Sequence, residues 1–340
     1  MRDKLGCTVT VTCNNLCDPL IESKDSRYIT FPRLTMRRLT GEHGLAYYIK
    51  SNNFGVIYDT GGTLKTFGPN LNAIEPHQEG IKSVFLSHGH HDHVGGLVSY
   101  LAVRKEKNGS SLELTCHPDA VRQRYRILQP NKVELPLKLT TIPTLIENNI
   151  IKKHAGISDT LLEKLGLKLR LTRESKILLE DKENNIKITT TGEIPRIYEK
   201  DTFLKYYIIE EGETVIQDLI MDDQALIIEN IGNYASVFLG CCHAGLENTI
   251  ARVKELTMLP IRIIVGGFHL VNTQIDKICK KHDFLEKLAL DGKYMEKGPN
   301  KLILRPTHCS GEKFYQYLKK NGSENLDVGR LPSGTRIHIR

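Results

Sequence analysis

Apolar and polar residues follow each other along the chain with the periodicities of strands and helices. Residues 7–12, CTVTVT, alternate strictly, which is typical of a half-buried strand. Short apolar runs bounded by turn residues predict further strands at 44–50, 54–62, 82–86, 112–118, 186–195, 224–230, 234–241, 261–270 and 301–311. Apolar residues at helical spacing predict helices at 95–107, 246–257 and 272–290.

The order of these elements indicates the fold class. A β-rich first half is followed by alternating strands and helices, in two similar blocks. We expect an α/β fold built as a four-layer αββα sandwich, with two sheets back to back and helices outside. Residues 130–185 mix short apolar runs with charge and are expected to form an insertion or subdomain. No linker divides the chain, so residues 1–340 are expected to form a single domain.

Composition and charge narrow the range of partners. The chain has 340 residues, of which 40% are hydrophobic and 26% charged, and a formal net charge of +7. It shows no membrane-spanning run and no leader-like N-terminus, so we expect a cytoplasmic protein without a membrane partner. The positive balance is compatible with a small anionic or phosphorylated substrate, although a solvated basic surface is the favoured explanation. Nucleic acid is disfavoured because no basic stripe carries interleaved aromatics, and a homo-oligomer is left open.

The highest density of potential metal-binding and catalytic side chains lies in residues 86–96, LSHGHHDHVGG, at the end of a predicted strand. His88 and His90 stand two apart in extended chain, so both rings project to one side. Asp92 and His93 follow where the chain turns into a helix. Two ligand pairs, N/N and O/N, predict a site for two metal ions, and imidazole with carboxylate suits zinc, iron or manganese. The alternative, a polar surface loop, does not explain the spacing.

These residues alone leave each ion short of ligands, because a metal site needs at least three from the protein. Three predicted strands end in a histidine, at His243, His269 and His308. Strand ends at one edge of a sandwich meet in space, so we expect these rings to approach the cluster. For each one taken alone, the alternative is a hydrogen-bonded structural ring. Asp92, His243 and His269 are also our candidates for catalytic groups.

Other polar residues at strand ends are candidates for a supporting role. Asp59 ends the strand before the cluster and is expected to accept a hydrogen bond from a ligating imidazole, or to be an ordinary turn aspartate. His117 also ends a predicted strand and is expected to support the site from outside the ligands, or to be structural. The remaining histidines without such context are expected at the surface or in the core: His43, His77, His154 and His282.

The chain contains a strand followed by Asp-Thr-Gly, then S-H-x-H-x-D-H-x-G-G, then H-P, and a last strand that ends in P-T-H. With these motifs in this order, it resembles the metallo-β-lactamase superfamily. Segments HGLAYYI, CHPDA, TGEIPR, DDQAL, GCCHAGLENTI, GGFHL and PTHCSGE, between about residues 43 and 313, resemble one group within it. That group includes the archaeal synthases of methanopterin biosynthesis, which join a dihydropterin to ribofuranosylaminobenzene phosphate. The resemblance implies an αββα sandwich with a dinuclear metal site.

The resemblance also implies particular ligands. The ligands that carry over directly are His88, His90, Asp92, His93 and His308. Most of the superfamily has a bridging aspartate where this chain has Gly-Cys-Cys-His at 240–243, so His243 is the candidate replacement and Cys241 a weaker one. A further superfamily histidine is absent near residues 191–193, where Glu193 is a candidate substitute, unless the metals are held asymmetrically. The implied cofactors are two divalent ions, zinc first, with magnesium, manganese and iron as alternatives.

Three hypotheses about function follow. The first is a metal-dependent transferase of the dihydropteroate-synthase-like type, acting on a phosphorylated, pterin-like substrate and releasing diphosphate. Arg196 and the turn amides at 244–245 are then candidate phosphate binders, or else a surface arginine and a plain helix cap. The second is a dinuclear metallohydrolase of a phosphodiester, lactone or related ester, although the missing aspartate argues against the ordinary two-metal form. The third, ranked last, is a metal-binding sensor or scaffold without turnover.

Overall fold

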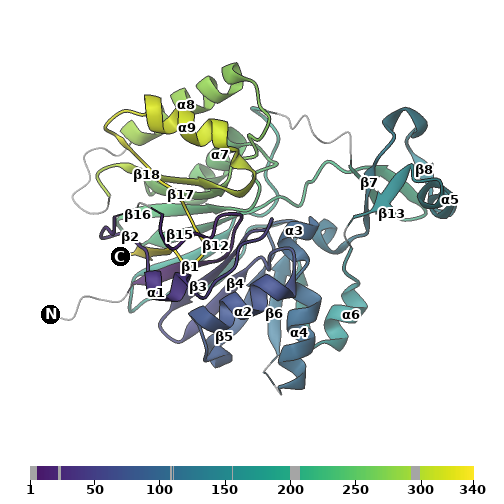
Figure 1. Cartoon of the computed structure of the whole chain (residues 1–340), viewed down its shortest axis with the longest axis horizontal. Coiled ribbons are helices and arrows are strands. Elements are labelled where there is room, and N and C mark those ends of the chain that lie inside the picture. The colour runs from purple at the N-terminus through teal and green to yellow at the C-terminus, as the bar shows by residue number, and fades with distance from the viewer. Residues whose placement is uncertain are drawn as a thin grey trace.

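In the computed structural model, two β-sheets lie face to face, with a layer of helices outside each (Figure 1). The structure describes residues 6–21, 24–107, 109, 111–154, 156–199, 207–291 and 299–340. Residues 1–5, which begin the segment expected to carry no leader, lie outside the described residues. The predicted αββα sandwich is confirmed. No helix within the described ranges is long and apolar enough to cross a bilayer.

The first sheet is built mainly from the N-terminal half. Its strand order is β10 (Leu167–Leu171), β6 (Leu112–Cys116), β5 (Ile81–Phe85), β4 (Phe54–Tyr58), β3 (Ala46–Ser51), β1 (Cys7–Cys13), β20 (Arg336–Ile339) and β2 (Ile29–Thr30). Strands β4, β5, β6 and β10 run parallel. The helices of this half are α1 (Arg33–Met36), α2 (Leu64–Ile74), α3 (His91–Val94), α4 (Leu97–Glu106) and α6 (Asp159–Lys164). The apolar sides of α2 and α4 pack on the outer face of this sheet.

The second sheet is built from the C-terminal half. Its order is β11 (Ile177–Asp181), β12 (Ile186–Thr190), β15 (Ala225–Asn230), β16 (Tyr234–Leu239), β17 (Ile261–Gly267), β18 (Leu302–Thr307) and β19 (Leu326–Val328). Strands β16 to β19 run parallel, so their carboxyl ends meet at one edge. Helices α7 (Leu246–Leu256), α8 (Ile275–Leu290) and α9 (Glu312–Asn321) cover its outer face.

Aromatic side chains fill the space between the two sheets and fix their relative position. The Tyr47 ring of β3 lies 5.8 Å from the Phe238 ring of β16, edge to face. The Tyr58 hydroxyl of β4 donates a hydrogen bond of 3.2 Å to the Phe238 carbonyl. Each of these buried rings contributes apolar area, and the hydroxyls find partners, as buried tyrosines require. The ends of β4, β5 and β16, which lead to the candidate site, are thereby held close together.

A third, smaller sheet projects from one side of the sandwich (Figure 1). Its order is β8 (Leu137–Lys138), β14 (Thr214–Gln217), β13 (Tyr207–Glu211), β7 (Arg124–Ile127) and β9 (Ile151–Lys153), with α5 (Ile142–Glu147) packed on it. The insertion predicted at 130–185 therefore has different bounds. Residues 167–171 and 177–181 are edge strands of the two main sheets, whereas residues 207–217 belong to the small sheet. Pairing between segments so distant in sequence leaves no trace in local periodicity.

Candidate metal centre

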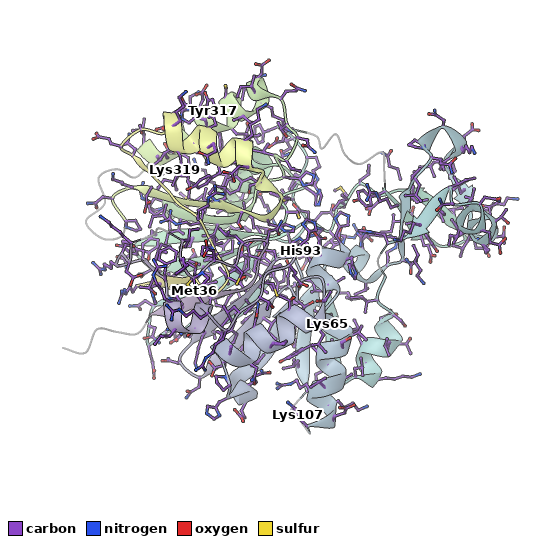
Figure 2. The ribbon with its side chains drawn as sticks, in the orientation of Figure 1. Met36, Lys65, His93, Lys107, Tyr317 and Lys319 are labelled. Atoms are coloured by element: carbon purple, nitrogen blue, oxygen red, sulfur yellow. The ribbon has the colours of Figure 1, made fainter. Side chains whose placement is uncertain are left out.

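The candidate ligands gather where strands of both main sheets end. The histidine loop follows β5, His243 follows β16, and His308 follows β18 directly. Figure 2 shows His93 at this edge, between the two halves of the sandwich and on the side of the small sheet. Convergence of these strand ends is what the sequence predicted, and it arises because the parallel strands present their carboxyl ends together.

The potential ligand atoms fall into two principal groups. The imidazole group consists of His88, His90 and His243, and the mixed group consists of Asp92, His93, Cys241 and His308. Within each group all ligand atoms lie within 4.8 Å of one another. The rings of His88 and His93, one from each group, are 4.3 Å apart, so the groups adjoin. Together they are called the metal centre below, and their division follows the N/N and O/N pairs of the sequence.

The imidazoles are oriented with one nitrogen outward and the other toward the centre. Nδ1 of His88 lies 2.9 Å from Ser87 Oγ, and Nδ1 of His93 lies 2.7 Å from Asp59 Oδ2. Nδ1 of His308 likewise lies 3.0 Å from Asn15 Oδ1. Contacts of this kind fix the tautomer of a metal-ligating histidine and leave Nε2 for the ion.

The unsatisfied atoms of the centre test whether a metal fits. Nε2 of His88 and Nε2 of His90 are buried and have no hydrogen-bond partner among the described residues. Two such orphaned nitrogens in adjacent rings are costly unless something else binds them. A divalent cation that accepts nitrogen, oxygen and sulfur ligands satisfies both, so the residues present fit the metals that the fold implies.

Electrostatics at the centre favours the unprotonated form of His88, His90 and Asp92 but the protonated form of His93. Burial lowers the pKa of His88 and His90 well below the usual range, so both rings are neutral. Burial opposes ionisation of Asp92, but the hydrogen bond from His308 and the nearby imidazoles hold the pKa of Asp92 well below its usual value. Burial also opposes protonation of His93, yet the Asp59 carboxylate raises the pKa of His93 to about 9. A metal ion bound at His93 would therefore replace a proton.

The backbone is strained where it delivers these side chains. Four described non-glycine residues close to strand ends at the centre have positive φ: Asp59 (57°), Cys242 (62°), His269 (48°) and His308 (53°). Such conformations cost on the order of 1–3 kcal/mol each and cluster at functional sites. Gly89, between two ligands, allows no side chain, because a Cβ there would lie 2.1 Å from Arg124 Nη1.

Several predicted residues contact the centre as expected, and Cys241 is itself part of one of the two ligand groups. Asp59 makes the predicted contact with a ligating ring, and it also accepts hydrogen bonds from the backbone N–H and the hydroxyl of Ser87. Cys241, only a weaker candidate in the sequence, places Sγ 3.1 Å from Nε2 of His93 and belongs to the mixed group. His269 packs its ring 4.1 Å from that of His243 and forms an overlapping group with Cys241 and His243.

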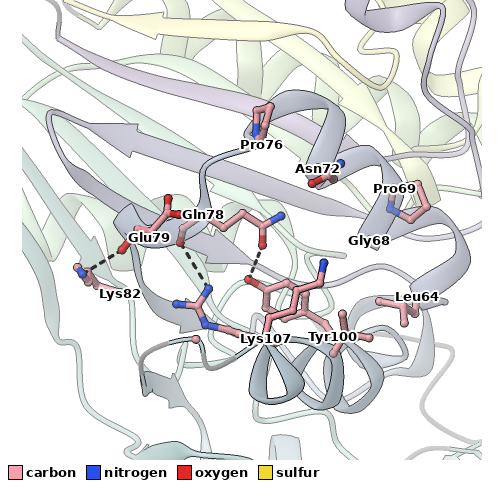
Figure 3. Close-up of a pocket in the computed structure, with 13 residues that line it drawn as sticks. Leu64, Gly68, Pro69, Asn72, Pro76, Gln78, Glu79, Lys82, Tyr100 and Lys107 are labelled. Carbon is pink, nitrogen blue, oxygen red and sulfur yellow. Dashed lines mark hydrogen bonds between the residues drawn. The ribbon is translucent and has the colours of Figure 1, made fainter.

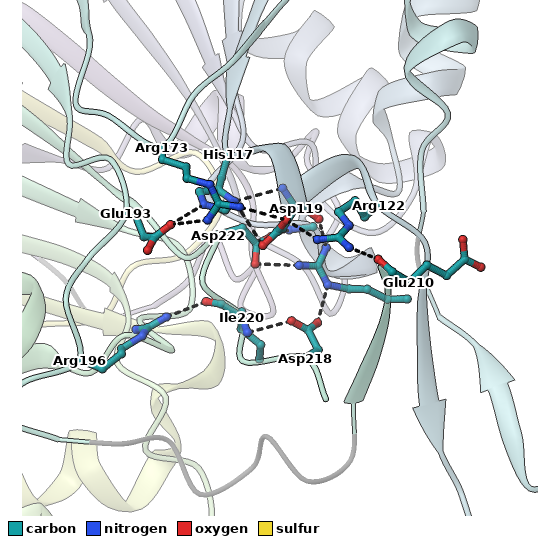
Figure 4. A network of polar contacts seen from close by, with 12 residues as sticks. His117, Asp119, Arg122, Arg173, Glu193, Arg196, Glu210, Asp218, Ile220 and Asp222 are labelled. Atoms are coloured by element: carbon teal, nitrogen blue, oxygen red, sulfur yellow. Dashed lines mark hydrogen bonds and ion pairs between the residues drawn. The ribbon is translucent and has the colours of Figure 1, made fainter. Parts of the chain in front are cut away.

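Other predicted residues lie outside the ligand groups, in a polar network shown in Figure 4. Glu193 Oε2 lies 2.9 Å from His117 Nε2 and accepts a hydrogen bond of 2.8 Å from Arg173. Arg196 donates a hydrogen bond of 2.6 Å to the carbonyl of Ile220. His117 thus supports the architecture around the centre, and Glu193 has the partners of a structural carboxylate rather than those of a ligand.

The turn amides proposed as phosphate binders are already occupied. The N–H of Ala244 donates to Asp223 Oδ2 at 2.8 Å, and the N–H of Gly245 donates to the carbonyl of Cys242 at 2.9 Å. The next free amide of the α7 N-terminus, that of Glu247, donates to Glu199 Oε1 at 3.0 Å. In this structure the chain's own groups occupy these amides, as the alternative of a plain helix cap expects, and phosphate binding there stays a prediction.

Three aromatic residues near the centre were missed from the sequence. His43, expected at the surface or in the core, stacks on His308 at 5.0 Å and places Nε2 3.4 Å from Asp92 Oδ2. His154, classed with it, lies 5.3 Å from His90 by ring centroids, and Tyr207 lies 4.9 Å from the same ring. His154 and Tyr207 both come from the small sheet, and no local sequence motif indicates where that sheet lies.

A larger hollow lies elsewhere, between α2 and α4 on the outer side of the first sheet (Figure 3). It encloses about 730 Å³ and is lined by Leu64, Gly68, Pro69, Asn72, Pro76, Gln78, Glu79, Lys82, Tyr100, Val103, Arg104, Lys107 and Gly109. Two of its polar side chains have partners within the lining: the Tyr100 hydroxyl donates to Gln78 Oε1 at 3.2 Å, and Lys82 donates to the backbone carbonyl of Glu79 at 3.0 Å. None of the candidate ligands lines this outer hollow.

Comparison with known proteins agrees with this geometry. Residues 39–125 match the family model of the metallo-beta-lactamase superfamily. An uncharacterised protein of Methanocaldococcus jannaschii is 27% identical over 277 residues, which are 82% of this chain and 87% of the relative. The 7,8-dihydropterin-6-methyl-4-(beta-D-ribofuranosyl)-aminobenzene-5'-phosphate synthase of the same organism is 24% identical over 302 residues, 85% of this chain and 89% of the relative.

A solved structure extends the agreement to the whole fold. The crystal structure of Tm1679, described as a metal-dependent hydrolase of the β-lactamase superfamily, superposes with a TM-score of 0.67 at 20% identity. The match covers 98% of this chain and 99% of that one. The fold expected from the sequence is thereby confirmed, and so is the resemblance on which that expectation partly rested.

Proposed function

From a chain with the metallo-β-lactamase fold, we propose a metal-dependent enzyme that uses two divalent ions, zinc first, on a small phosphorylated substrate. The observation that carries the proposal is the pair of adjoining ligand groups with buried, unpartnered Nε2 atoms on His88 and His90. One ion would be held by the imidazole group and the other by the mixed group. When bound, such cations act as Lewis acids and neutralise charge that develops on a leaving group.

The chain's own residues would hold this centre rigid. Asp59 and Asn15 keep the rings of His93 and His308 turned with Nε2 inward. The N–H of Gly89 donates a 2.7 Å hydrogen bond to Asp222, which is itself paired with the buried Arg124 at 2.7 Å. The histidine loop is therefore tied to the start of the small sheet as well as to the sandwich, which favours a precise ligand geometry.

The reaction that we propose is a transfer. The amine of an aminobenzene riboside phosphate would form a bond to the methylene carbon of a dihydropterin methyl diphosphate. The carbon–oxygen bond to diphosphate breaks, diphosphate leaves with the electron pair, and the amine loses one proton. Similarity to a protein named as the corresponding synthase, over 85% of this chain, supports this choice. The replacement of the usual bridging aspartate by Gly-Cys-Cys-His at 240–243 supports it too, because it departs from ordinary hydrolytic sites.

The experiment is to incubate metal-loaded protein with dihydropterin methyl diphosphate and ribofuranosylaminobenzene 5'-phosphate, and to measure coupled product and diphosphate. We expect both products in equal amounts, and neither from His88→Ala. The exposed His77, far along the first sheet from the centre, gives the control His77→Ala. Absence of coupled product from metal-loaded wild type would overturn the transfer.

Hydrolysis is the second candidate, because nitrogen, oxygen and sulfur ligands around adjoining ions also suit the activation of water. A panel of phosphodiesters, lactones and related esters, tested on the same preparations, distinguishes the two. Turnover on this panel without coupling would establish the hydrolase. Tight metal binding with no turnover on either set would instead support a sensor or scaffold.

A further inference from the structure

The small sheet has two chemically different faces. In its register Tyr207 of β13 stands opposite Arg126 of β7, which stands opposite Lys152 of β9. Directly opposed residues project to the same face, and successive residues alternate. One face carries the apolar cluster under α5: Tyr125, Ile127, Ile142, Ile151, Ile208 and Val215. The other face, called the polar face below, carries Arg126, Lys152 and Tyr207, together with His154 at the end of β9.

The polar face is turned toward the metal centre. The ring of Tyr207 lies 4.9 Å and the ring of His154 lies 5.3 Å from the ring of His90, which belongs to the imidazole group. The two rings are 5.2 Å from each other. In Figure 1 the small sheet stands beside α3, the short helix of residues 91–94 that continues the histidine loop. The small sheet therefore forms a side of the centre rather than a remote appendage.

One atom of this face lacks a partner. Nε2 of His154 is buried and makes no hydrogen bond within the described part of the chain. Buried polar atoms are almost always satisfied, so an exception beside a candidate active centre points to a ligand that would satisfy it. Arg126 stands directly opposite Tyr207 in the strand register, so its side chain leaves the sheet on the same face. Burial raises the pKa of Tyr207, and the positive charge of Arg126 opposes that rise.

We infer that Arg126, His154 and Tyr207 form a subsite for a phosphate-type group of the substrate, beside the imidazole group. The planar guanidinium of Arg126 matches two phosphate oxygens, and Nε2 of His154 donates to a third. The ring of Tyr207 packs against the rings of both His154 and His90, and so sets the position of the bound group relative to the metals. The inference deepens the proposed function and rests on it for the identity of the substrate, but its geometry comes from the small sheet alone.

The test is a calorimetric titration of the protein with inorganic diphosphate, in metal-loaded and metal-free form. The variants are Arg126→Ala and His154→Gln, and Lys153→Ala is the matched control. Lys153 is an exposed cation on β9 that pairs with Tyr125 and so projects from the opposite face of the sheet. Metal content and circular dichroism of each variant report whether the centre and the fold are intact.

We expect diphosphate affinity to fall about tenfold or more in Arg126→Ala and in His154→Gln, as for loss of a charge-assisted hydrogen bond. Lys153→Ala is expected to stay within about twofold of wild type, as a screened surface charge should. Wild-type affinity in both polar-face variants would overturn the inference, and so would a wild type that does not bind diphosphate at millimolar concentration. Failure of the proposed function appears separately, as absent metal or absent coupling, while the titration stays interpretable.

Discussion

The metal centre lies where strands of both main sheets end, whereas the outer hollow lies between α2 and α4 on the outer side of the first sheet. The two regions differ in whether their buried polar groups have partners. The hollow encloses about 730 Å³, and polar side chains such as Tyr100 and Lys82 have hydrogen-bond partners within its lining. The centre instead holds buried nitrogens without partners among the described residues, and backbone at positive φ. The open volume of the hollow therefore reflects loose packing between α2 and α4. Unsatisfied polar atoms and backbone strain, in contrast, indicate that the metal centre is the functional site.

The largest expected effect is the loss of a ligand. His88→Ala or His308→Ala should lower metal affinity by more than the roughly 10–100-fold that loss of a supporting residue costs, and should abolish turnover. Metal content after dialysis against a chelator, measured by mass spectrometry, checks this. The control His77→Ala should retain wild-type metal. Equal metal content in all three variants would remove the distinction between the centre and the rest of the surface.

Removal of the Cys241 sulfur should affect the mixed group but not the imidazole group. Cys241→Ser should weaken the mixed group and spare the imidazole group, so that about one equivalent fewer metal remains bound. Burial raises the pKa of Cys241, so its thiolate form depends on a nearby cation, and cobalt-loaded wild type should show thiolate-to-cobalt absorption that this variant lacks. Cys242→Ser is the matched control, because Sγ of Cys242 points to Thr249 Oγ1 at 3.6 Å. Retention of the absorption band in Cys241→Ser would exclude Cys241 as a ligand.

A smaller effect is expected from the residue that orients His93. Asp59→Asn keeps the size of the side chain but loses the carboxylate that accepts from Nδ1 of His93 at 2.7 Å. Metal affinity should fall about 10–100-fold, with the fold preserved. Isothermal titration with zinc measures the change, and Asp276→Asn on the exposed start of α8 serves as control. An affinity equal to that of wild type would mean that Asp59 is only a turn residue.

The smallest effect is expected at the outer hollow. Asn72→Trp places a bulky ring at an exposed position that lines the hollow, and should leave metal content unchanged and turnover within about twofold. Turnover and metal content measured beside wild type check this. A tenfold loss of turnover would show that the hollow takes part in function, and the contrast between the hollow and the metal centre would no longer hold.

The sequence predicted most of what forms the sandwich. Strands such as β1, β5 and β17 are buried runs or strict alternations, so their local pattern and their tertiary role agree. Helix α2 was not predicted, because Gly68 and Pro69 stand inside it and mask its amphipathic pattern. The four candidate ligands of residues 86–96 could be proposed because they are adjacent, and His243, His269 and His308 because each follows a recognisable strand.

The rest depends on side-chain placement that spacing cannot supply. Cys241 and His243 are two residues apart, yet Cys241 belongs to the mixed group and His243 to the imidazole group, and both also join the overlapping group with His269. The residue between them, Cys242, has positive φ. His154 reaches the centre only because β9 pairs with β7, and Tyr207 only because β13 pairs with β7 on its other side. The paired residues are 24 to 28 positions apart for β9 with β7 and about 80 apart for β13 with β7, so local sequence patterns do not show the pairing. The same tertiary pairing explains the misplaced bounds of the insertion.

A crystal structure of zinc-loaded protein, with anomalous differences recorded at the zinc edge, tests the central claim most directly. We predict two peaks, one within about 2.0–2.3 Å of Nε2 of His88 and His90, and one at a similar distance from Nε2 of His308 and Sγ of Cys241. A single peak at the imidazole group, with Cys241 turned away, would contradict the dinuclear centre. No peak at either group, in protein that binds zinc elsewhere, would contradict the account as a whole.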